Sequence, residues 1–340
     1  MTQSSFNTQL IPLGVVGLGL MGSSITTCML VAGHPVIAIA PMPSDQQNAL
    51  PRIREHLDKA YQERLITQEP AYYLSQLTIT SEYSQLKDCR IVIESVIEDL
   101  QVKQSVFAKI ESVVNEDAII GSNTSAIPIS TLQLAFRIPG RFMGLHWMEP
   151  AYTNRFLEII CGDLTDMQLA EWVYSLSSLW QKEPTLVRKD IRGFITNRLM
   201  YAMYREAFYL VENGYATVED VDRACRNSPG YWMTLVGVFR WMDLTGLPAY
   251  RTVMQDLFPT LNNQTEVPRL IDEIVQDDGK GILNGKGFYN YTPEEAQLWK
   301  QTYEEFSYEI RRLALKYPAD VVAQKLAGNP KEPTNTEKES

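Results

Sequence analysis

The chain has 340 residues, of which 45% are apolar and 21% are charged, and its formal net charge is −10 at pH 7. This length predicts two domains, and the composition is typical of a globular protein with a sizeable core. A negative chain should repel nucleic-acid phosphates, and no apolar run is long enough to span a bilayer. We therefore expect no nucleic-acid partner and no membrane partner.

The four cysteines are widely scattered and form no CxxC pair: Cys28, Cys89, Cys161 and Cys225. This spacing argues against a zinc site and against a disulfide framework, so we expect no metal and a reducing cytoplasmic location. The first residues, MTQSSFNTQLIP, lack the charged and apolar regions of a secretory signal, which favours the same location.

Short apolar runs alternate with helical patterns in the first half of the chain. Residues 13–16 and 36–39 are apolar runs on either side of a helical pattern at residues 20–32, which indicates a β-α-β unit. Residues 45–80 are polar and helical in pattern. Further strand-like runs follow at residues 91–93, 118–121, 142–145, 156–160 and 185–187. This alternation predicts an α/β domain with a doubly wound parallel sheet of the Rossmann type over residues 10–188.

The pattern becomes helical after residue 188. Apolar residues recur at helical spacing over residues 193–211, and Thr217 begins a capping-box pattern that ends at Asp220. Residues 292–317 read as a long final helix. We predict an all-helical C-terminal domain over residues 189–317 and a disordered tail over residues 328–340.

A GxGxxG motif lies between the first predicted strand and the first predicted helix and consists of Gly17, Leu18, Gly19, Leu20, Met21 and Gly22. The first glycine permits a tight turn, the second admits a pyrophosphate close to the backbone, and the third allows close packing of helix on strand. The N-terminus of the helix attracts the anion. The motif predicts a dinucleotide site, and the alternative is a glycine-rich turn that binds nothing.

One expected part of the dinucleotide site is missing. A site that prefers NAD usually has an acid at the end of the second strand, where it binds the ribose hydroxyls. Ala40 stands there, followed by Pro41, and no arginine is present to hold a 2′-phosphate. The choice between NAD and NADP is therefore open. We expect weak NAD binding that Ala40→Asp would strengthen.

Oxidation of an alcohol by hydride transfer needs a base for the hydroxyl proton, and histidine is the usual choice. The three histidines are His34, His56 and His146. His146 follows the strand-like run at residues 142–145, so it should lie at the carboxyl edge of the sheet, where ligands bind. His146 is therefore the candidate base, although a lone histidine is more often structural.

The segment Gly144-Leu-His146-Trp-Met-Glu-Pro150 resembles the GLHFFNP motif of the 3-hydroxyacyl-CoA dehydrogenase family. Four more motifs of this family occur in its order over roughly residues 12–291. They are ExxxE…K at Glu94, Glu98 and Lys103, SNTS at 122–125, KDxPGFIxNR at 189–198 with Arg192 in place of proline, and GxGFY at 285–289. The sequence thus resembles this family over most of its length.

The resemblance implies catalytic roles for four residues. His146 would accept the hydroxyl proton, and Glu158 would orient the imidazole and stabilise its charged form. Ser125 and Asn197 match the polar residues that hydrogen-bond the reacting oxygen. Taken without the motifs, Glu158 could be an exposed carboxylate beside a strand, and Ser125 and Asn197 could be ordinary surface residues.

The resemblance also implies NAD as the cofactor. Glu98 and Lys103 match residues that contact its nicotinamide half, although they could equally form a solvated helix pair. Ser125 would lie beside the cofactor as well. Glu149 replaces the family asparagine at a cofactor contact, and Ala40 replaces the ribose-binding acid.

The leading expectation for function is reversible oxidation of a 3-hydroxyacyl-CoA with NAD, in fatty acid metabolism. Cations in the helical excursion could hold the CoA phosphates: Arg52, Arg54, Lys59 and Arg64. Glu63 stands where the family has a CoA-binding lysine, and residues 231–237 depart from the family's YPMGPF. The acyl chain length, the direction of flux and the pathway stay open.

Two alternatives remain open. The first is a dehydrogenase of a free hydroxy acid, of the gulonate or carnitine type, which Trp147, Trp232 and Glu149 could suit. The second is a non-catalytic cofactor-binding or structural protein on the same fold. The resemblance further implies a homodimer joined through residues beyond about 190, because large apolar residues such as Phe239 and Leu244 would be buried there.

Overall fold

The computed structural model describes residues 11–328, and the chain divides into two compact units, Met1–Met200 and Tyr201–Ser340. The predicted boundary at residues 188–189 stays a prediction. Of the predicted tail, Gly328 ends a helix, and residues 329–340 lie outside the described residues.

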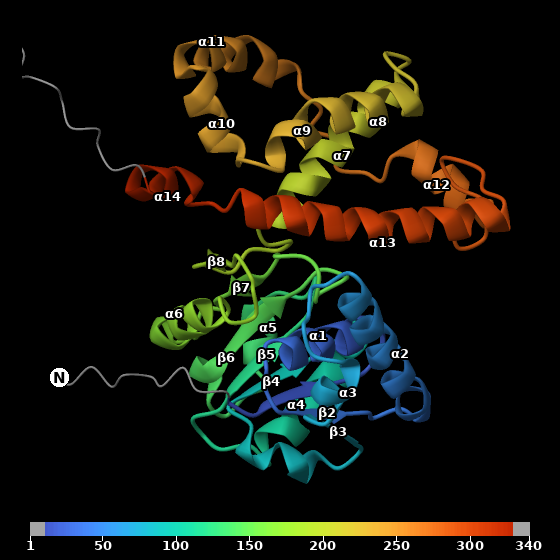
Figure 1. Ribbon diagram of the computed structural model, residues 1–340. Helices are drawn as coiled ribbons and strands as arrows, with labels where there is room; N and C mark the ends of the chain where they lie inside the picture. Colours follow the sequence, from blue (N-terminus) through green and yellow to red (C-terminus); the bar gives the residue numbers. More distant parts are fainter. Residues whose placement is uncertain (1–10, 329–340) are drawn as a thin grey trace, which may run out of the picture. The chain divides into compact units, whose positions relative to one another are not determined.

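The first unit is built on one eight-stranded sheet in the order β3-β2-β1-β4-β5-β6-β7-β8 (Figure 1). Its strands are β1 (Leu13–Val16), β2 (Val36–Ile39), β3 (Leu77–Thr80), β4 (Ile91–Glu94), β5 (Ile119–Ser122), β6 (Phe142–His146), β7 (Glu158–Ile160) and β8 (Thr185–Val187). All neighbouring strands are parallel except β6 and β7. The Rossmann-type fold is confirmed, with one antiparallel pairing that the sequence did not predict.

Helices cover both faces of this sheet, so the unit is doubly wound. The helices are α1 (Leu20–Val31), α2 (Pro43–Gln62), α3 (Pro70–Leu74), α4 (Leu100–Glu111), α5 (Ile129–Gln133) and α6 (Met167–Leu176), with 3-10 turns η1 (Tyr83–Asp88) and η2 (Pro139–Arg141). Apolar residues of α1, α2, α3 and α6 belong to one core cluster, and those of α4, α5 and η1 belong to the other. Two separate apolar layers follow, one on each face.

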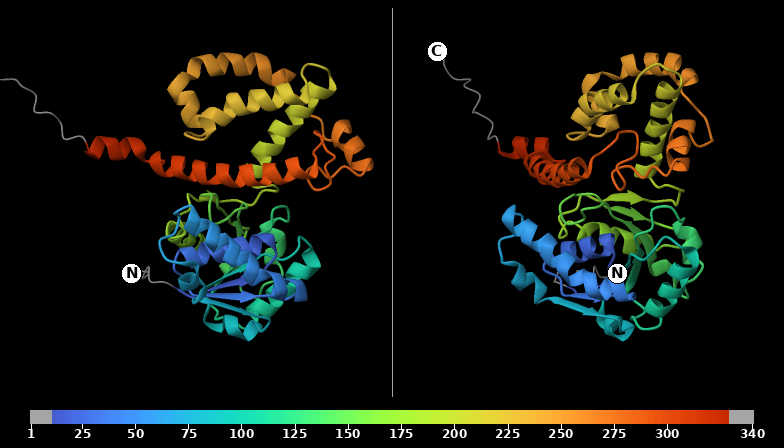
Figure 2. Two further views of the ribbon diagram at one scale, coloured as in Figure 1. Left: turned by 45° about the vertical axis from the view of Figure 1, so that its right-hand side comes forward. Right: turned by 90° about the vertical axis from the view of Figure 1, so that its right-hand side faces the viewer.

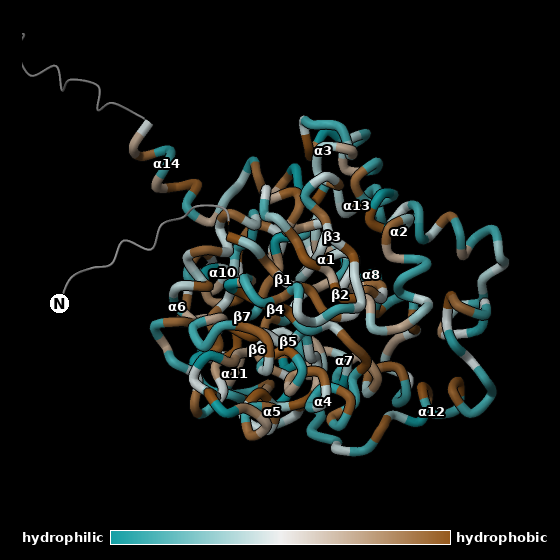
Figure 3. The backbone as a smooth tube through the Cα atoms, turned by 90° about the horizontal axis from the view of Figure 1, so that it is seen from below, coloured by the Kyte–Doolittle hydropathy of each residue, from teal (hydrophilic) through white to brown (hydrophobic). Residues whose placement is uncertain are grey.

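The segment predicted as a polar helical excursion, residues 45–80, is helical only in part. Its end forms β3, an edge strand whose residues are half-buried or exposed and include Thr78 and Thr80. A half-exposed edge strand needs few apolar residues, so its sequence lacked the apolar run that indicated the other strands. The earlier part is α2, whose buried residues recur at helical spacing among polar ones (Figure 3): Ala49, Ile53, His56, Leu57 and Ala60.

The second unit is helical (Figure 2). It holds most of α7 (Thr196–Glu212), then α8 (Val218–Asn227), α9 (Pro229–Met233), α10 (Val238–Thr245), α11 (Leu247–Leu257), the 3-10 turn η3 (Phe258–Thr260), α12 (Arg269–Gln276), α13 (Pro293–Lys316) and α14 (Val321–Gly328). Its described residues contain isolated β-bridges but no strand. Thr217 caps α8 through the Asp220 amide at 3.2 Å, and Thr292 with Glu295 forms a full capping box on α13.

Candidate active site

The antiparallel pairing of β6 and β7 places His146 directly opposite Glu158. His146 Nδ1 lies 2.8 Å from Glu158 Oε2, and both side chains are buried. A carboxylate only accepts hydrogen bonds, so Nδ1 carries the proton and Nε2 is left as the nitrogen that can accept one. This pairing of predicted residues gives an oriented histidine with its basic nitrogen on the side away from the acid.

Glu158 is fully buried and bound on its other oxygen as well. Its Oε1 accepts from the backbone amides of Ile195 and Thr196, at 3.1 and 2.9 Å, and from the Thr196 hydroxyl at 3.1 Å. Burial raises the pKa of Glu158, but the hydrogen bonds from His146 and Thr196 outweigh it and hold the pKa below its usual value. Glu158 is therefore a carboxylate that can stabilise a protonated imidazole.

Ser125 and Asn197 lie at the same place. Ser125 Oγ is 3.1 Å from His146 Nε2, and Asn197 Nδ2 donates to the Ser125 carbonyl at 3.1 Å. The structure thus brings together all four residues for which the sequence predicted catalytic roles. The Ser125 hydroxyl donates to the same nitrogen that would accept a substrate proton, so an incoming hydroxyl would meet both groups.

Two phenylalanines that the sequence analysis did not single out flank the histidine ring. The ring centroids of Phe156 and Phe194 each lie 5.5 Å from that of His146. Both occur inside segments already recognised, a strand-like run and a family motif, but no sequence pattern shows that they touch His146. Their rings pack against the imidazole, one edge-on and one tilted.

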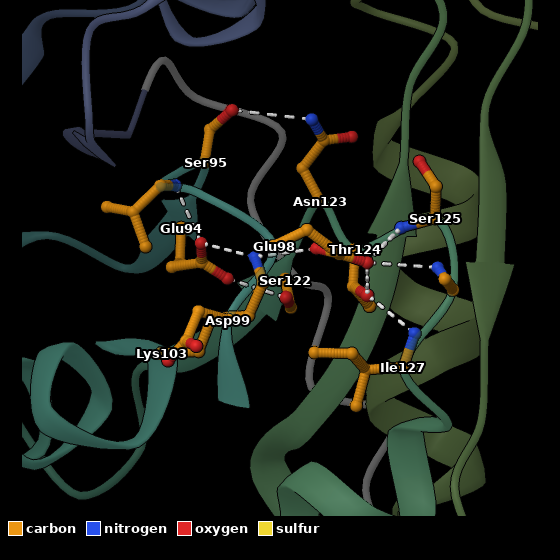
Figure 4. A network of polar contacts seen from close by, with 12 residues as sticks. Glu94, Ser95, Glu98, Asp99, Lys103, Ser122, Asn123, Thr124, Ser125 and Ile127 are labelled. Atoms are coloured by element: carbon orange, nitrogen blue, oxygen red, sulfur yellow. Dashed lines mark hydrogen bonds and ion pairs between the residues drawn. The ribbon is translucent and has the colours of Figure 1, made fainter. Parts of the chain in front are cut away.

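Glu98 fixes the turn that carries Ser125 (Figure 4). Its Oε1 accepts from the amides of Ser125 and Ala126, each at 3.0 Å, and from the Thr124 hydroxyl. Burial raises the pKa of Glu98, but the Thr124 hydroxyl and the charge of Lys103 bring it below its usual value. The acid therefore binds the backbone of the turn as a carboxylate.

Lys103 is completely buried, and its Nζ is bound by two acids, Glu94 at 2.7 Å and Glu98 at 3.3 Å (Figure 4). The Ser122 hydroxyl donates to the other oxygen of Glu94 at 2.6 Å. The Lys103 side chain has no exposed surface in this structure, and the cofactor contact expected of it stays a prediction. Its amine holds Glu98, and through it the turn.

The GxGxxG loop has the form that a pyrophosphate needs. Gly17 adopts a φ of 91°, and a Cβ on Gly22 would lie 1.8 Å from the Gly17 carbonyl oxygen, so both positions require glycine. A Cβ on Gly19 would meet nothing within 4 Å and would fill the space above the loop. Gly19 is the N-cap of α1 and no side chain caps that helix, which leaves its first amides available to an anion.

The other residues predicted to bind the cofactor differ in the exposed fraction of their side chains. Leu18 and Ala40 are fully buried, whereas Leu20 is 60% exposed. Leu18 therefore contributes its backbone alone, and Ala40 offers no surface to a ligand. Asp45, to which no sequence motif gives a role, also contacts this loop, and its Oδ2 accepts from the Leu18 amide at 3.1 Å.

Arg52 also reaches this loop from α2. Its Nη1 donates to the Leu18 carbonyl at 3.0 Å and to the Ser23 hydroxyl at 3.2 Å. The sequence suggested Arg52 as one of the cations for CoA phosphates, and in this structure its Nη1 binds the dinucleotide loop.

Glu149 lies close to the same loop and has a buried oxygen, Oε2, with no hydrogen-bond partner. Burial raises the pKa of Glu149 to about 7, although a hydrogen bond from Ser24 and the charge of Arg52 oppose the rise. The side chain therefore exchanges a proton near neutral pH beside the predicted cofactor site.

No helix within residues 11–328 combines the length and the apolar character of a membrane span. Within the same residues, no group of three or more histidine, cysteine or acidic side chains is placed to hold a metal ion.

A glycine-rich loop at the switch point of a doubly wound sheet, together with an oriented histidine, defines a nucleotide-dependent dehydrogenase. The 3-hydroxyacyl-CoA dehydrogenase NAD-binding domain matches residues 12–191, and the C-terminal domain of the same family matches residues 193–291. The chain belongs to the 3-hydroxyacyl-CoA dehydrogenase family and is an NAD-dependent oxidoreductase.

Three relatives within this family have different names. A 3-hydroxybutyryl-CoA dehydrogenase of Mycobacterium tuberculosis is 33% identical over 82% of this chain and 98% of its own length. An L-carnitine dehydrogenase of Oceanobacillus iheyensis is 30% identical over 77% of this chain and 86% of its own. A 5-formyl-3-hydroxy-2-methylpyridine 4-carboxylate 5-dehydrogenase of Mesorhizobium japonicum is 29% identical over 88% and 97%.

A crystal structure is known for an enzyme of the last activity, described as an NAD+-dependent dismutase. That structure is 27% identical in sequence to this chain and superposes with a TM-score of 0.81. The match covers 94% of this chain and 100% of the chain in the crystal structure. The family is therefore settled, and the relatives differ in the substrate that they are named for.

The raised pKa of Glu149 makes the stability of the cofactor-free protein depend on pH. The carboxyl is protonated in both states below its ordinary pKa of 4.5, and its folded form loses the proton only near 7. Stability should therefore fall as the pH rises from about 5 to 8, because unfolding releases a proton in this window. Relative to Glu149→Gln, the native protein should lose roughly 1–3 kcal/mol of unfolding free energy.

Denaturant unfolding at pH 5 and at pH 8 measures this difference. Glu116→Gln, which neutralises an exposed carboxylate of the same unit, is the matched control and should follow the native pH profile. Parallel profiles for the native protein and Glu149→Gln would contradict the prediction.

Proposed function

We propose that the protein reversibly oxidises the hydroxyl-bearing carbon of a small free hydroxy acid, with His146 as the base. The observation that carries the proposal is the chain of contacts from Glu158 through His146 to Ser125, at 2.8 and 3.1 Å. When bound, NAD supplies the acceptor for the hydride that leaves the carbon. The residues of the chain bind the hydroxyl and take its proton.

Proton transfer follows from the state of the histidine. Nε2 of His146 accepts the hydroxyl proton, and the resulting imidazolium is stabilised by Glu158, whose charge is itself held by the amides at the start of α7. Ser125 would donate a hydrogen bond to the reacting oxygen. Asn197, which holds the Ser125 carbonyl in this structure, would keep that hydroxyl in place. In the reverse direction the imidazolium returns the proton to the carbonyl oxygen.

Removal of the base should slow the reaction without weakening cofactor binding. His146→Ala should lower turnover at least about 10²-fold, the lower end for a lost general base. Glu158→Gln keeps the shape of the side chain but removes the charge, so turnover should also fall. The measurements are kcat by NADH absorbance and NADH affinity by fluorescence.

Glu171→Gln, which changes an exposed carboxylate of the same unit, is the control and should leave kcat unchanged. Near-native turnover of His146→Ala would show that another group takes the proton, and the proposed mechanism would fail.

The contacts of the basic residues on α2 support a free acid over a CoA ester as the substrate. Of the four cations expected to hold CoA phosphates, Arg52 is bound to the dinucleotide loop, and Lys59 lies 3.1 Å from Glu55. Glu63, at the position of the family's CoA-binding lysine, ends α2 as an acid. Phosphate binding by this segment would therefore depend mainly on the other two cations, Arg54 and Arg64. Trp147, which the sequence suggested for substrate contact, is only 3% exposed and packs on Trp180, so it offers little surface to a substrate.

The extent of similarity supports the same choice. The two family models match residues 12–191 and 193–291, so their match ends before α13. The pyridine carboxylate dehydrogenase structure covers 94% of this chain, so its similarity continues into the region of α13 and α14. In the comparison by sequence, the pyridine carboxylate dehydrogenase of Mesorhizobium japonicum covers 88% of this chain and the 3-hydroxybutyryl-CoA dehydrogenase covers 82%. A relative named for a small carboxylate thus shares more of this chain than a relative named for a CoA ester.

A 3-hydroxyacyl-CoA, the leading expectation from the sequence, is kept as the second candidate. It is favoured by the 33% identity to the 3-hydroxybutyryl-CoA dehydrogenase over 282 residues.

The two candidates differ in their need for the CoA handle. We expect NADH-dependent reduction of free 3-oxobutyrate, used as a probe acid, to exceed that of 3-oxobutyryl-CoA. Changing Arg54, Lys59 and Arg64 together to glutamine should leave both rates unchanged. Arg52 stays native in this variant because it binds the loop. A preference for the thioester, lost in the triple variant as a fall in kcat/KM, would establish the acyl-CoA assignment instead.

We also propose that the protein is a homodimer joined through its helical unit. Within the described part of that unit, large apolar side chains are exposed, with Phe239 at 78% and Leu244 at 64%. Apolar surface of this kind marks an interaction site. Light scattering at micromolar protein should give twice the mass of 38.7 kDa, and a monomeric mass would contradict the proposal.

A further inference from the structure

The corner between the ends of β1 and β2 holds an acid from an unexpected element. Ala40 follows β2 directly, and the Gly17 amide at the end of β1 donates to the Ile39 carbonyl at 3.0 Å, so the two strand ends are adjacent. Asp45, in the first turn of α2, reaches this corner through its hydrogen bond from the Leu18 amide at 3.1 Å. Its neighbour Gln46 donates to the Ala40 carbonyl at 3.2 Å. The Asp45 carboxylate therefore lies beside the position where the second strand usually supplies an acid.

Asp45 and Arg52 hold the same peptide unit of the loop from opposite sides. Asp45 accepts from the Leu18 amide, and Arg52 donates to the Leu18 carbonyl. The two residues are seven apart, which places them on one face of α2, two turns from each other. Both residues bind the loop through charged side chains, so the position of the Asp45 carboxylate relative to the loop is fixed.

Only one oxygen of Asp45 is used for this contact. The Leu18 amide takes Oδ2, and no described residue donates to Oδ1. Asp45 is partly exposed, so the second oxygen is open to a ligand. A carboxylate with a free oxygen next to a pyrophosphate loop has the chemistry that binds a ribose diol, because it accepts from hydroxyls and repels a phosphate in their place.

We propose that Asp45 binds the adenosine ribose hydroxyls of NAD in place of the acid that is missing at Ala40, and that it makes the site prefer NAD over NADP. The proposal rests on NAD as the cofactor and is independent of which substrate the enzyme oxidises. It predicts the opposite of weak NAD binding that Ala40→Asp would strengthen, and the two expectations are separated by the test below. With Asp45 in place, the charge is already present, and a second carboxylate at Ala40 would be buried beside it.

The test compares Asp45→Asn with Asp58→Asn, a matched change at an exposed position of the same helix. Asparagine at position 45 retains an oxygen for the Leu18 amide but has lost the charge. NADH and NADPH are titrated by fluorescence without substrate, and thermal unfolding of each variant is recorded. We expect Asp45→Asn to weaken NADH binding at least about tenfold and to strengthen NADPH binding, with a small change in Tm. Asp58→Asn should leave both affinities unchanged.

Unchanged affinities in Asp45→Asn, or equal changes in Asp58→Asn, would overturn the proposal, because Asp45 would then be a loop contact or a distant charge. Should Asp45→Asn fail to fold, Ala40→Asp in the native background decides. Tenfold tighter NADH binding in that variant would mean that no carboxylate of the native protein binds the ribose hydroxyls, and the proposal would be wrong. Because no substrate is present in these titrations, they are unaffected if the proposed substrate is wrong.

Discussion

The candidate active site depends on a buried charge, the carboxylate of Glu158. A buried carboxylate without partners is strongly destabilising, so every group that satisfies it is held firmly in place. Its partners come from two separate places: His146 at the end of β6, and Ile195 and Thr196 at the start of α7. The antiparallel turn of the chain between β6 and β7 is what places the acid opposite the histidine. The same interactions that stabilise the acid therefore orient the base.

A second buried charge network holds the other side of the site. Lys103 lies between Glu94 and Glu98, and Glu98 in turn binds the amides of the turn that carries Ser125. The two networks meet at the contact between Ser125 and the histidine. Both need accurate geometry, because a buried ion with one partner displaced is costly. Lys103, which does not contact Ser125, therefore affects its position only through Glu98 and the turn.

Helix α2 serves the cofactor loop through charges of opposite sign. The amide and the carbonyl of Leu18 are bound by an acid and a guanidinium from one helix face. The sequence suggested α2 as the element that binds the CoA part of a substrate. In the structure, Asp45 and Arg52 of this helix contact the dinucleotide loop. The contacts that shape the dinucleotide loop therefore all lie inside the first unit. The relatives of this family differ instead in the substrate for which they are named.

The sequence by itself determined the Rossmann-type fold, the glycine loop and the choice of His146, because these depend on local patterns: apolar periodicity, glycine spacing and position after a strand. It also indicated Glu158, Ser125 and Asn197 through motif resemblance, and the structure brings them together. Only the tertiary structure decided that Lys103 is buried, that Arg52 binds the loop and that Asp45 reaches Leu18, across 27 positions of the chain. A charged residue on a helix looks the same in the sequence whether it faces water or a partner. Its role is set by the packing of distant segments, which no local pattern records.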